Sequence, residues 1–231
     1  FRQLIKENLI FMRTYFIIIT LFLAHSSKAD EFNEYGLYSN KSASPQETAP
    51  VKTTLPLKIA KESKIAYIGN TLLDRAQHFG HFESFLQRRL PDHKLVIRNF
   101  SWSADEVDIQ PRPDNFATTD QHLLYHKTDI IFAAFGFNES FSGKEKIPEF
   151  KSRLSKFINH TKTRAYNGKK GPKIILISPT PNQNLKHIPA ADLNNERLLL
   201  FTQAMREVAN SEEIGFVDVF SAPYPERSTI N

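Results

Sequence analysis

Three short polar stretches carry side chains that could do chemistry. The first is Gly69-Asn70-Thr71, the second runs from Asn99 to Glu106, and the third is Gly136-Phe137-Asn138-Glu139. Each follows an apolar run typical of a buried strand. Between them they offer hydroxyl, amide and carboxylate groups to a ligand, and their order along the chain makes them a constellation rather than three unrelated turns.

Each stretch also has a purely structural interpretation. Thr71 and Asp74 have the spacing of a helix N-cap pair, and Ser103 with Glu106 has the same spacing. Asn138 is a residue type that tolerates a left-handed turn. Capping and turn formation therefore remain alternatives to a functional role at each stretch.

The elements that must position these residues alternate between strand and helix. Apolar runs such as 130–133 and 174–177 are continuous, as expected when helices cover both faces of a parallel sheet. We predict a three-layer α/β/α doubly wound parallel sheet, whose ligands bind beyond the carboxyl ends of the strands. The expected strands are 64–68, 95–98, 129–135, 173–178 and 216–220, and the expected helices are 72–90, 121–127, 147–164 and 194–209.

The first 57 residues predict a targeting segment and a linker. Met12 is a candidate start, an apolar run spans 15–24, and Ser27-Lys28-Ala29 resembles a signal-peptidase site. The apolar run is about half of the ~20 residues that a membrane span needs. We expect a signal peptide over 1–29, a disordered linker over 30–57, a folded α/β domain over 58–231, and a secreted or periplasmic protein with no membrane span after cleavage.

Composition excludes several classes of partner and chemistry. Residues 1–29 hold four Lys/Arg and one Glu, so the net charge falls from +5 to +2 without them. No basic block with interleaved aromatic residues indicates binding to nucleic acid. The chain has no cysteine, which excludes disulfides and thiolate chemistry.

The strand-end stretches resemble the first three conserved blocks of the SGNH (GDSL-like) hydrolases, over about 64–220. Further stretches, Phe79-Gly-His-Phe-Glu83 and Asn194-Asn-Glu-Arg-Leu198, resemble the GDSL-like proteins of planctomycetes. The resemblance implies a flavodoxin-like sheet, an esterase activity on an acyl or acetyl ester, and no cofactor or metal. The implied substrate is a small molecule or a polysaccharide ester.

The resemblance also implies a role for individual residues. Thr71 holds the nucleophile position, Ala104 supplies a backbone N–H to the oxyanion where the family has glycine, and Asn138 supplies a side-chain amide. The residues expected to contact substrate are Asn70, Trp102 and Phe137. Threonine departs from the family pattern, because its extra methyl group restricts χ1 and crowds the line of attack.

The family's catalytic histidine has no counterpart here. Eleven residues follow Phe220, and none is histidine. The favoured interpretation is a chain that stops before that histidine, and the alternative is a catalytically inactive module that binds a carbohydrate at the cell surface. A less favoured alternative is a flavodoxin-like FMN protein, since flavodoxins also place Gly-Asn-Thr after their first strand.

The remaining histidines are expected to have other roles. His78 and His81 are three residues apart, which suits metal ligation, but no carboxylate or histidine partner has a recognisable spacing. His187 follows the fourth strand in a loop at the active edge, where it is a weak candidate for a substitute base. No metal site is expected.

Overall fold

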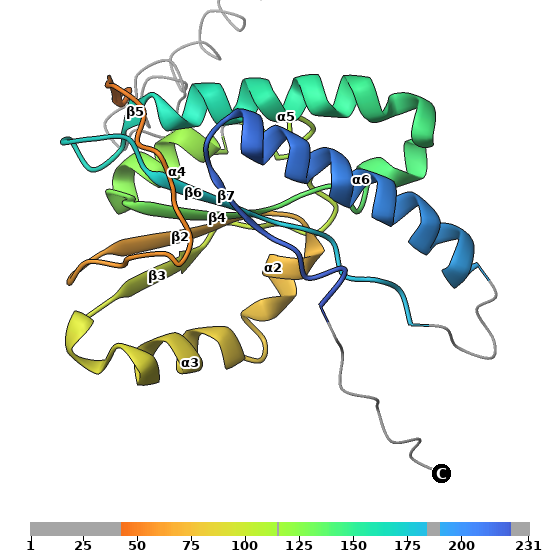
Figure 1. Cartoon of the computed structure of the whole chain (residues 1–231). Coiled ribbons are helices and arrows are strands. Elements are labelled where there is room, and N and C mark those ends of the chain that lie inside the picture. The colour runs from red at the N-terminus through yellow and green to blue at the C-terminus, as the bar shows by residue number, and fades with distance from the viewer. Residues whose placement is uncertain (1–42, 115, 184–189, 223–231) are drawn as a thin grey trace, which may run out of the picture. The chain divides into compact units, whose positions relative to one another are not determined.

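The computed structural model describes residues 43–114, 116–183 and 190–222. Contacts divide the chain into two compact units, one formed by Phe1–Ala43 with Pro113–Thr118 and the other by Ser44–Arg112 with Thr119–Asn231. In the small unit, the Phe116 N–H donates to the Pro113 carbonyl at 3.2 Å. Everything below concerns the large unit, whose elements are labelled in Figure 1.

The large unit contains a five-stranded sheet in which every neighbouring pair is parallel. From β2 the chain builds first to one side and then to the other, which is the doubly wound arrangement. The predicted fold class is therefore confirmed. In spatial order the strands are β3 (Val96–Asn99), β2 (Lys64–Gly69), β4 (Ile130–Ala134), β6 (Lys173–Ile177) and β7 (Gly215–Val217).

Helices cover both faces of the sheet because successive strand residues point to opposite sides. Ile131 and Ala133 pack in one core cluster, and Ile130 and Phe132 pack in another. The first cluster is covered by α4 (Thr119–His126), α5 (Ile147–Lys162) and α6 (Ala191–Ser211), and the second by α2 (Thr71–Ala76) and α3 (His81–Arg89). Figure 1 shows α5 and α6 on one side of the sheet with α2 and α3 on the other.

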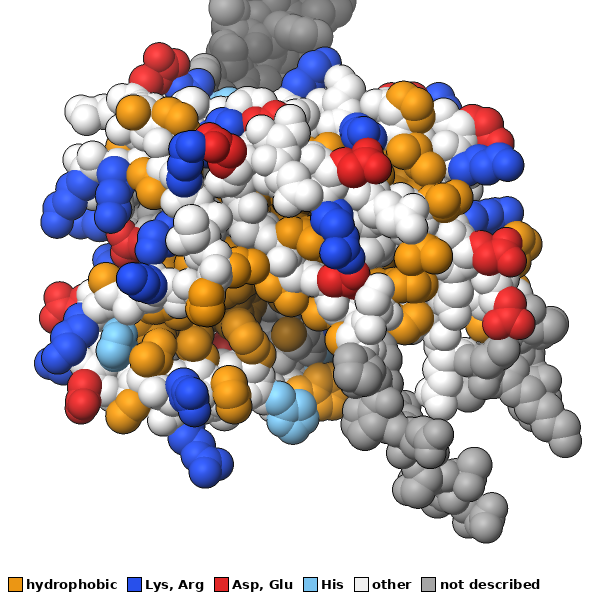
Figure 2. Space-filling model, in the orientation of Figure 1, with side chains coloured by type: hydrophobic (Ala, Val, Ile, Leu, Met, Phe, Trp, Pro, Cys, Tyr) orange, Lys and Arg blue, Asp and Glu red, His pale blue; other side chains and the backbone are white. Residues whose placement is uncertain are grey.

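Helix α3 and the turn before it leave aromatic side chains exposed. Phe79, Phe82 and Phe85 are 69, 43 and 65% exposed, and Figure 2 shows hydrophobic side chains gathered over the face that carries α3. Phe82 also packs edge-on against Phe132 of the sheet, with ring centroids 5.6 Å apart. Phe79 and Phe85 therefore belong to the surface and not to the second core cluster.

The helix expected over 72–90 is broken into two. Gly80 has φ +60 and precedes α3, whereas α2 already ends at Ala76. A left-handed residue cannot continue a right-handed helix, so the apolar period persists while the axis changes direction. Sequence periodicity alone did not reveal this break. The short 3-10 helices η3 (Pro91–His93), η4 (Glu139–Ser142) and η5 (Lys144–Lys146) were also not predicted.

The segment expected to be a disordered linker makes regular contacts over its second half. β1 (Gln46–Glu47) pairs antiparallel with β5 (Arg164–Ala165). Thr53 N–H donates to the Glu213 carbonyl at 3.1 Å, and its Oγ1 accepts from Ile174 N–H at 3.1 Å. Polar residues lacking apolar period can still pair with a distant segment, here in a two-stranded sheet of their own, which the linker prediction over 30–57 did not foresee. Its first part and the expected signal segment lie outside the described residues.

Other boundaries differ by a few residues. Strand β7 ends at Val217, earlier than expected, and α6 begins at Ala191, earlier than expected. The described part of the chain contains no helix that combines the length and the apolar character needed to cross a membrane.

Candidate active site

The loop after β2 is shaped by a glycine and a buried asparagine. Gly69 has φ +113, and a Cβ there would lie 2.1 Å from the Ala134 carbonyl oxygen, so only glycine fits. Asn70 is 2% exposed; its N–H donates to the Ala134 oxygen at 3.0 Å and its Oδ1 accepts from Leu72 N–H at 3.2 Å. Asn70 is therefore the N-cap of α2. Asn70 was predicted to contact substrate, but its side-chain oxygen is engaged in capping the helix.

Capping by Asn70 changes the interpretation of Thr71. The expected Thr71–Asp74 cap is wrong, because Thr71 is the first residue inside α2 and Asp74 accepts instead from Ser103 Oγ. Thr71 is partly exposed, and its hydroxyl has no hydrogen-bond partner among the described residues. The Thr71 hydroxyl therefore does not cap α2, and it is available to contact a ligand.

The loop after β3 is held to the first loop and presents Ala104. Trp102 N–H donates to the Gly69 carbonyl at 2.9 Å, and Asn99 Nδ2 donates to the Leu73 carbonyl at 2.7 Å. Ala104 is exposed with φ +71, and its N–H has no partner among the described residues. The site thus requires a left-handed residue at the position where the resemblance implies glycine, and this conformation costs alanine about 1 kcal/mol.

The expected Ser103–Glu106 cap does not form either. Ser103 Oγ donates to Asp74, and the carboxylate of Glu106 pairs with Arg153 on α5 at 2.9 Å. These bonds join the loop after β3 to α2 and to α5. Both side chains therefore hold the loop in place from outside instead of capping a helix within it.

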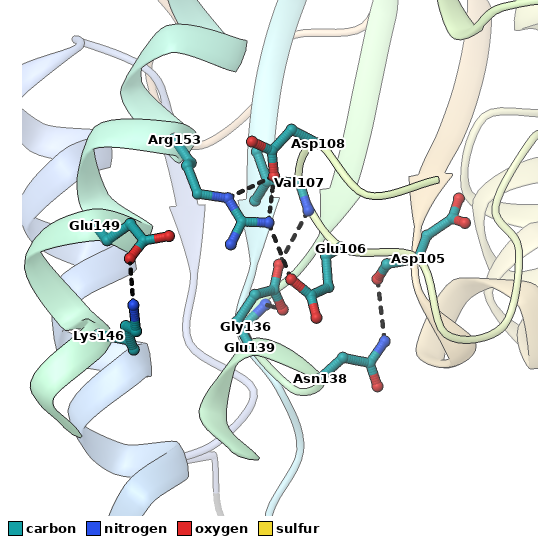
Figure 3. A network of polar contacts seen from close by, with 10 residues as sticks. All are labelled: Asp105, Glu106, Val107, Asp108, Gly136, Asn138, Glu139, Lys146, Glu149 and Arg153. Carbon is teal, nitrogen blue, oxygen red and sulfur yellow. Dashed lines mark hydrogen bonds and ion pairs between the residues drawn. The ribbon is translucent and has the colours of Figure 1, made fainter. Parts of the chain in front are cut away.

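The loop after β4 carries Asn138 in right-handed, not left-handed, conformation, with φ −66 and ψ −42. The left-handed residue is Gly136, with φ +89. One N–H of the Asn138 amide donates to the Asp105 carbonyl at 3.0 Å, as Figure 3 shows. The other N–H of this amide remains available to a ligand.

These bonds connect all three loops in pairs. Asn70 joins the first loop to the end of β4, Trp102 joins the second to the first, and Asn138 joins the third to the second. The structure therefore brings Thr71, Ala104 and Asn138 to the same edge of the sheet. This closed set of contacts is the principal geometric feature of the site.

Trp102 lies at the rim of this edge and is oriented by a buried ion pair. Asp105 is 2% exposed and accepts from Nη1 and Nη2 of Arg112 at 2.7 and 2.6 Å. The guanidinium lies 4.5 Å from the centre of the Trp102 ring, while 47% of Trp102 remains exposed. A bidentate carboxylate pair below a cation–π contact restricts the indole to one orientation.

Phe137, the third predicted substrate contact, is half-buried. Its ring packs edge-on against Phe141, with centroids 5.6 Å apart and an interplanar angle of 78°. Phe141 is 56% exposed. Phe141 is therefore the better-exposed of the two rings.

Sequence reasoning assigned no role to two buried carboxylates and one buried serine. Glu139 is 2% exposed, and its carboxylate accepts from Gly136 N–H at 2.8 Å and from Val107 N–H at 3.1 Å. Ser178 is fully buried, and its Oγ accepts from the N–H groups of Val219 and Phe220 at 2.9 and 3.0 Å. Together with Asp105, these residues anchor loops rather than face solvent. The only signal for Glu139 in the sequence was its place beside Asn138.

The histidines do not form a metal centre in the described part of the chain. His81 stacks on Phe79, with ring centroids 6.1 Å apart, and among described residues no group of three potential ligands gathers. His187 lies outside the described residues. His126 is buried near the opposite end of the sheet, where its Nε2 lies 3.1 Å from the Ile65 carbonyl, and burial lowers its pKa.

Comparisons with known proteins support the fold. No family model and no curated protein matches the chain by sequence. An acetylxylan esterase from Geobacillus stearothermophilus superposes with a TM-score of 0.54 at 17% identity, covering 71% of this chain and 80% of the esterase. A carbohydrate acetylesterase from Sinorhizobium meliloti gives 0.53 at 14% identity, covering 71% of this chain and 87% of that one.

A third similar structure is a gut microbial diltiazem-metabolizing enzyme. Its TM-score is 0.53 at 17% identity, and the match covers 74% of this chain and 39% of that enzyme. At these identities the comparisons show the fold alone. The chain thus shares the parallel α/β/α sheet of these enzymes.

Proposed function

We propose that this domain is an SGNH-type hydrolase that cleaves an acyl or acetyl ester, with an acetylated carbohydrate as the favoured substrate. The observation that carries the proposal is the closed set of hydrogen bonds that unites the loops bearing Thr71, Ala104 and Asn138. The two esterases of similar fold are described as acting on acetylxylan and as a carbohydrate acetylesterase. That description supports the choice of substrate class.

The proposed chemistry places the ester carbonyl against three donors. Thr71 Oγ1 attacks the carbonyl carbon and gives its proton to a base, and the charge that develops on the carbonyl oxygen is stabilised by the N–H groups of Thr71 and Ala104 and by the second N–H of Asn138. The C–O bond to the alcohol then breaks, the alcohol leaves with that proton, and water releases the acid from acyl-Thr71. Donors that are oriented before the reaction stabilise this charge without reorganisation, and in many acyl transfers this stabilisation contributes most of the rate enhancement. Asp105 contributes by holding Asn138 through its carbonyl.

A base must accept the Thr71 proton. Catalytic mutants of the Geobacillus esterase carry alanine in place of a histidine, an aspartate or a serine. In this chain we propose that Thr71 takes the place of the serine nucleophile. The last histidine of the sequence is His187. The base is the component of the mechanism that the described residues do not supply.

The first test compares Asn138→Ala with the unmodified protein on an aryl acetate. Loss of an oxyanion donor is expected to lower kcat by about 100-fold, or ~3 kcal/mol of barrier. Asn210→Ala is the matched control, because Asn210 is exposed near the end of α6 and no contact places it near the strand ends. An undiminished rate in Asn138→Ala, or an equal loss in the control, contradicts the assignment.

Thr71→Ser probes the nucleophile from the opposite direction. Serine keeps the hydroxyl and removes the methyl group that crowds the attack, so the rate is expected to rise. Because Asn70 caps α2, the free energy of unfolding should change little. A rate that does not respond to serine, in a protein whose activity depends on Asn138, would remove Thr71 from the mechanism.

A second candidate function is a binding module for an acetylated carbohydrate. The exposed faces of Trp102 and Phe141, at 47 and 56%, favour it because sugars stack on aromatic rings held in place. Trp102 is the only tryptophan of the chain, so its fluorescence reports binding directly. Saturable quenching by acetylated xylo-oligosaccharide without release of acetate would support this function over hydrolysis.

We also propose that the protein is exported. The support is the signal-like order of Arg13, the apolar run 15–24 and the small residues that precede position 30. The test is the N-terminus of the protein recovered outside the cytoplasm. A mature N-terminus near Asp30 is expected, and retention of the full segment in the cytoplasm would refute export.

A further inference from the structure

Glu139 links two of the loops that form the proposed oxyanion hole. Its two carboxylate oxygens accept from different loops, Oε2 from Gly136 N–H at 2.8 Å and Oε1 from Val107 N–H at 3.1 Å. Figure 3 shows the carboxylate lying between these two backbone segments. Val107 comes three residues after Ala104, and Glu139 itself follows Asn138. The carboxylate therefore bridges the segments that carry two of the three donors.

A carboxylate can make this bridge only when it is ionised. Both oxygens then act as acceptors, whereas a protonated carboxyl group presents one O–H donor and loses acceptor capacity at that oxygen. Neither backbone N–H has another acceptor among the described residues. Protonation thus breaks one side of the bridge and leaves a buried N–H without its partner.

The surroundings make ionisation of Glu139 costly. Burial raises the pKa of Glu139 to about 7, against the opposing hydrogen bonds from backbone N–H groups, and the charge of Glu106 adds to the increase. Arg153 of α5 faces the same region but is engaged by Glu106 and Asp108. On the side of α6, Gly136 packs against Met205. Glu139 therefore makes this bridge without an ion pair to Arg153, which the other two carboxylates engage.

We propose that Glu139 is a positioning residue that sets the separation of Ala104 N–H and the Asn138 amide by clamping their loops together. Its catalytic consequence rests on the proposed ester hydrolysis. Its structural consequence does not, because the clamp exists whether or not a substrate reacts. With the clamp closed, the donors converge; with the clamp open, the bond from the Asn138 amide to the Asp105 carbonyl is the remaining side-chain link described between these two loops.

Protonation of the clamp gives the site a pH dependence of defined sign. The donors are assembled above about pH 7, where Glu139 is ionised, and are released below it. A misplacement of about 1 Å in catalytic groups costs up to ~100-fold in rate. We therefore expect kcat to rise as pH increases through about 7, with little change in KM.

The first arm of the test needs no enzymatic turnover. NMR resonances of Gly136 and Val107 amides and of the Asn138 side-chain amide are followed from acid to alkaline pH in the full chain and in Glu139→Gln. The three resonances should shift together with one midpoint near 7, and the variant should lose this transition. If Asn138 does not titrate with the two backbone amides, Glu139 does not position it.

Glu106→Gln is the matched control for this arm. It removes the neighbouring carboxylate, which contacts Arg153 and neither of the two clamped N–H groups. Because the charge of Glu106 raises the pKa of Glu139, the common transition should remain and its midpoint should move to lower pH. Loss of the transition in Glu106→Gln would assign it to Glu106 and overturn the proposal.

The second arm measures aryl acetate hydrolysis against pH. Glu139→Gln is expected to lose about 10-fold to 100-fold in kcat with KM nearly unchanged, and its pH profile should lack the limb near 7. Combining it with Asn138→Ala should add little further loss, since the clamp acts by setting the Asn138 amide against Ala104 N–H and that variant has already lost the amide. A Glu139→Gln variant with normal kcat and an unchanged limb overturns the catalytic role. Absence of any Asn138-dependent rate would refute the proposed function, while the NMR arm still decides the clamp.

Discussion

The two ends of the parallel sheet are stabilised by different chemistry. At the amino end, two buried side chains that hold the backbone are neutral hydroxyls: Thr53 accepts from Ile174 N–H, and Thr128 donates to the Leu123 carbonyl at 3.0 Å. The carboxylate there that accepts from a backbone N–H, Asp129 from Lys64 at 2.9 Å, is only partly buried. At the carboxyl end, the hydroxyl of Ser178 is joined by two carboxylates that are each 2% exposed: Glu139 holds two backbone N–H groups and Asp105 holds the Arg112 side chain. A buried charge costs desolvation that a hydroxyl does not.

The difference indicates which end of the sheet carries features that lower the stability of the folded state. The carboxyl end also holds the glycine with the closest backbone approach, Gly69. Left-handed non-glycine residues occur at both ends, Ala104 after β3 and Lys127 before β4 among them, so buried charge and not backbone conformation distinguishes the two ends. Costly features concentrate at functional sites, where surrounding structure maintains them. This contrast supports the placement of the candidate active site, and substitutions at each end can break or sharpen it.

The largest effect is expected for Gly69→Ala. The new Cβ would lie 2.1 Å from the Ala134 oxygen at φ +113, so β2 and β4 must separate, at a cost of at least about 4 kcal/mol in the free energy of unfolding. Gly168→Ala is the control, because Gly168 also has positive φ but no neighbour within 4 Å; it should lose only about 1 kcal/mol. Urea unfolding measures both, and equal losses would show that the close approach is unimportant.

Asp105→Asn should follow. It leaves Arg112 without its bidentate partner in a largely buried position, which we expect to destabilise the domain by about 3 kcal/mol. Release of the guanidinium should also change the fluorescence of Trp102, the only tryptophan. Thr53→Val, which removes a neutral acceptor at the amino end, should cost about 1 to 2 kcal/mol and leave fluorescence unchanged. A larger loss for Thr53→Val would reverse the comparison.

The pH dependence of stability provides a comparable effect at the carboxyl end. The pKa of Glu139 is raised from 4.5 to about 7 in the folded state, so between these values the unfolded chain releases a proton that the folded chain retains. The free energy of unfolding should therefore decrease as pH rises from about 4.5 to 7, by about 3 kcal/mol at most from this group. Denaturant unfolding across this range checks it. Glu139→Gln should have a flatter profile, and an identical one would contradict the assignment.

This stability change has the opposite sign to the expected change in activity. The same ionisation that closes the clamp on Gly136 and Val107 removes the stability that the protonated carboxyl group provided. If rate and stability both rise with pH through 7, the ionised clamp is not the cause of the rate. If the rate rises while the free energy of unfolding falls, ionisation of Glu139 orders the donors at a cost in stability.

The smallest effect is expected for Ala104→Gly. Glycine adopts φ +71 without the steric penalty of Cβ, so the domain should gain about 1 kcal/mol, minus the entropy of a more flexible unfolded chain. The backbone N–H is kept, and the hydrolytic rate should therefore remain within about twofold. Thermal unfolding and the aryl acetate assay check the two parts. A loss of stability would show that Cβ of Ala104 makes a contact worth more than the strain.

Much of the architecture could be predicted because it depends on local patterns. The continuous apolar runs 130–133 and 174–177 were sufficient to predict parallel strands buried on both faces, and the observed sheet confirms this. The break at Gly80 was missed, since helical period continues across it. The pairing of β1 with β5 was missed because a two-residue strand has no periodicity and depends on an edge more than a hundred residues away.

The candidate site shows the same division. Polar residues after each strand could be recognised, because parallel strands bring their carboxyl ends to one edge. Which of them cap and which remain free could not, as Asn70 and Thr71 illustrate: both can cap a helix, and only the approach of Ala134 to Gly69 places Asn70 at that position.

The sequence by itself determined the class of fold and the three stretches that meet at the carboxyl edge of the sheet, because hydrophobic period and strand-end chemistry are local properties. Only the tertiary structure decided that Ala104 adopts left-handed backbone, that Asp105 orients Trp102 through Arg112, and that Glu139 joins two loops. These depend on contacts between segments distant in the chain. The desolvation cost of a buried polar or charged group depends on its burial, and the burial of a side chain is set only when the layers of the fold pack together.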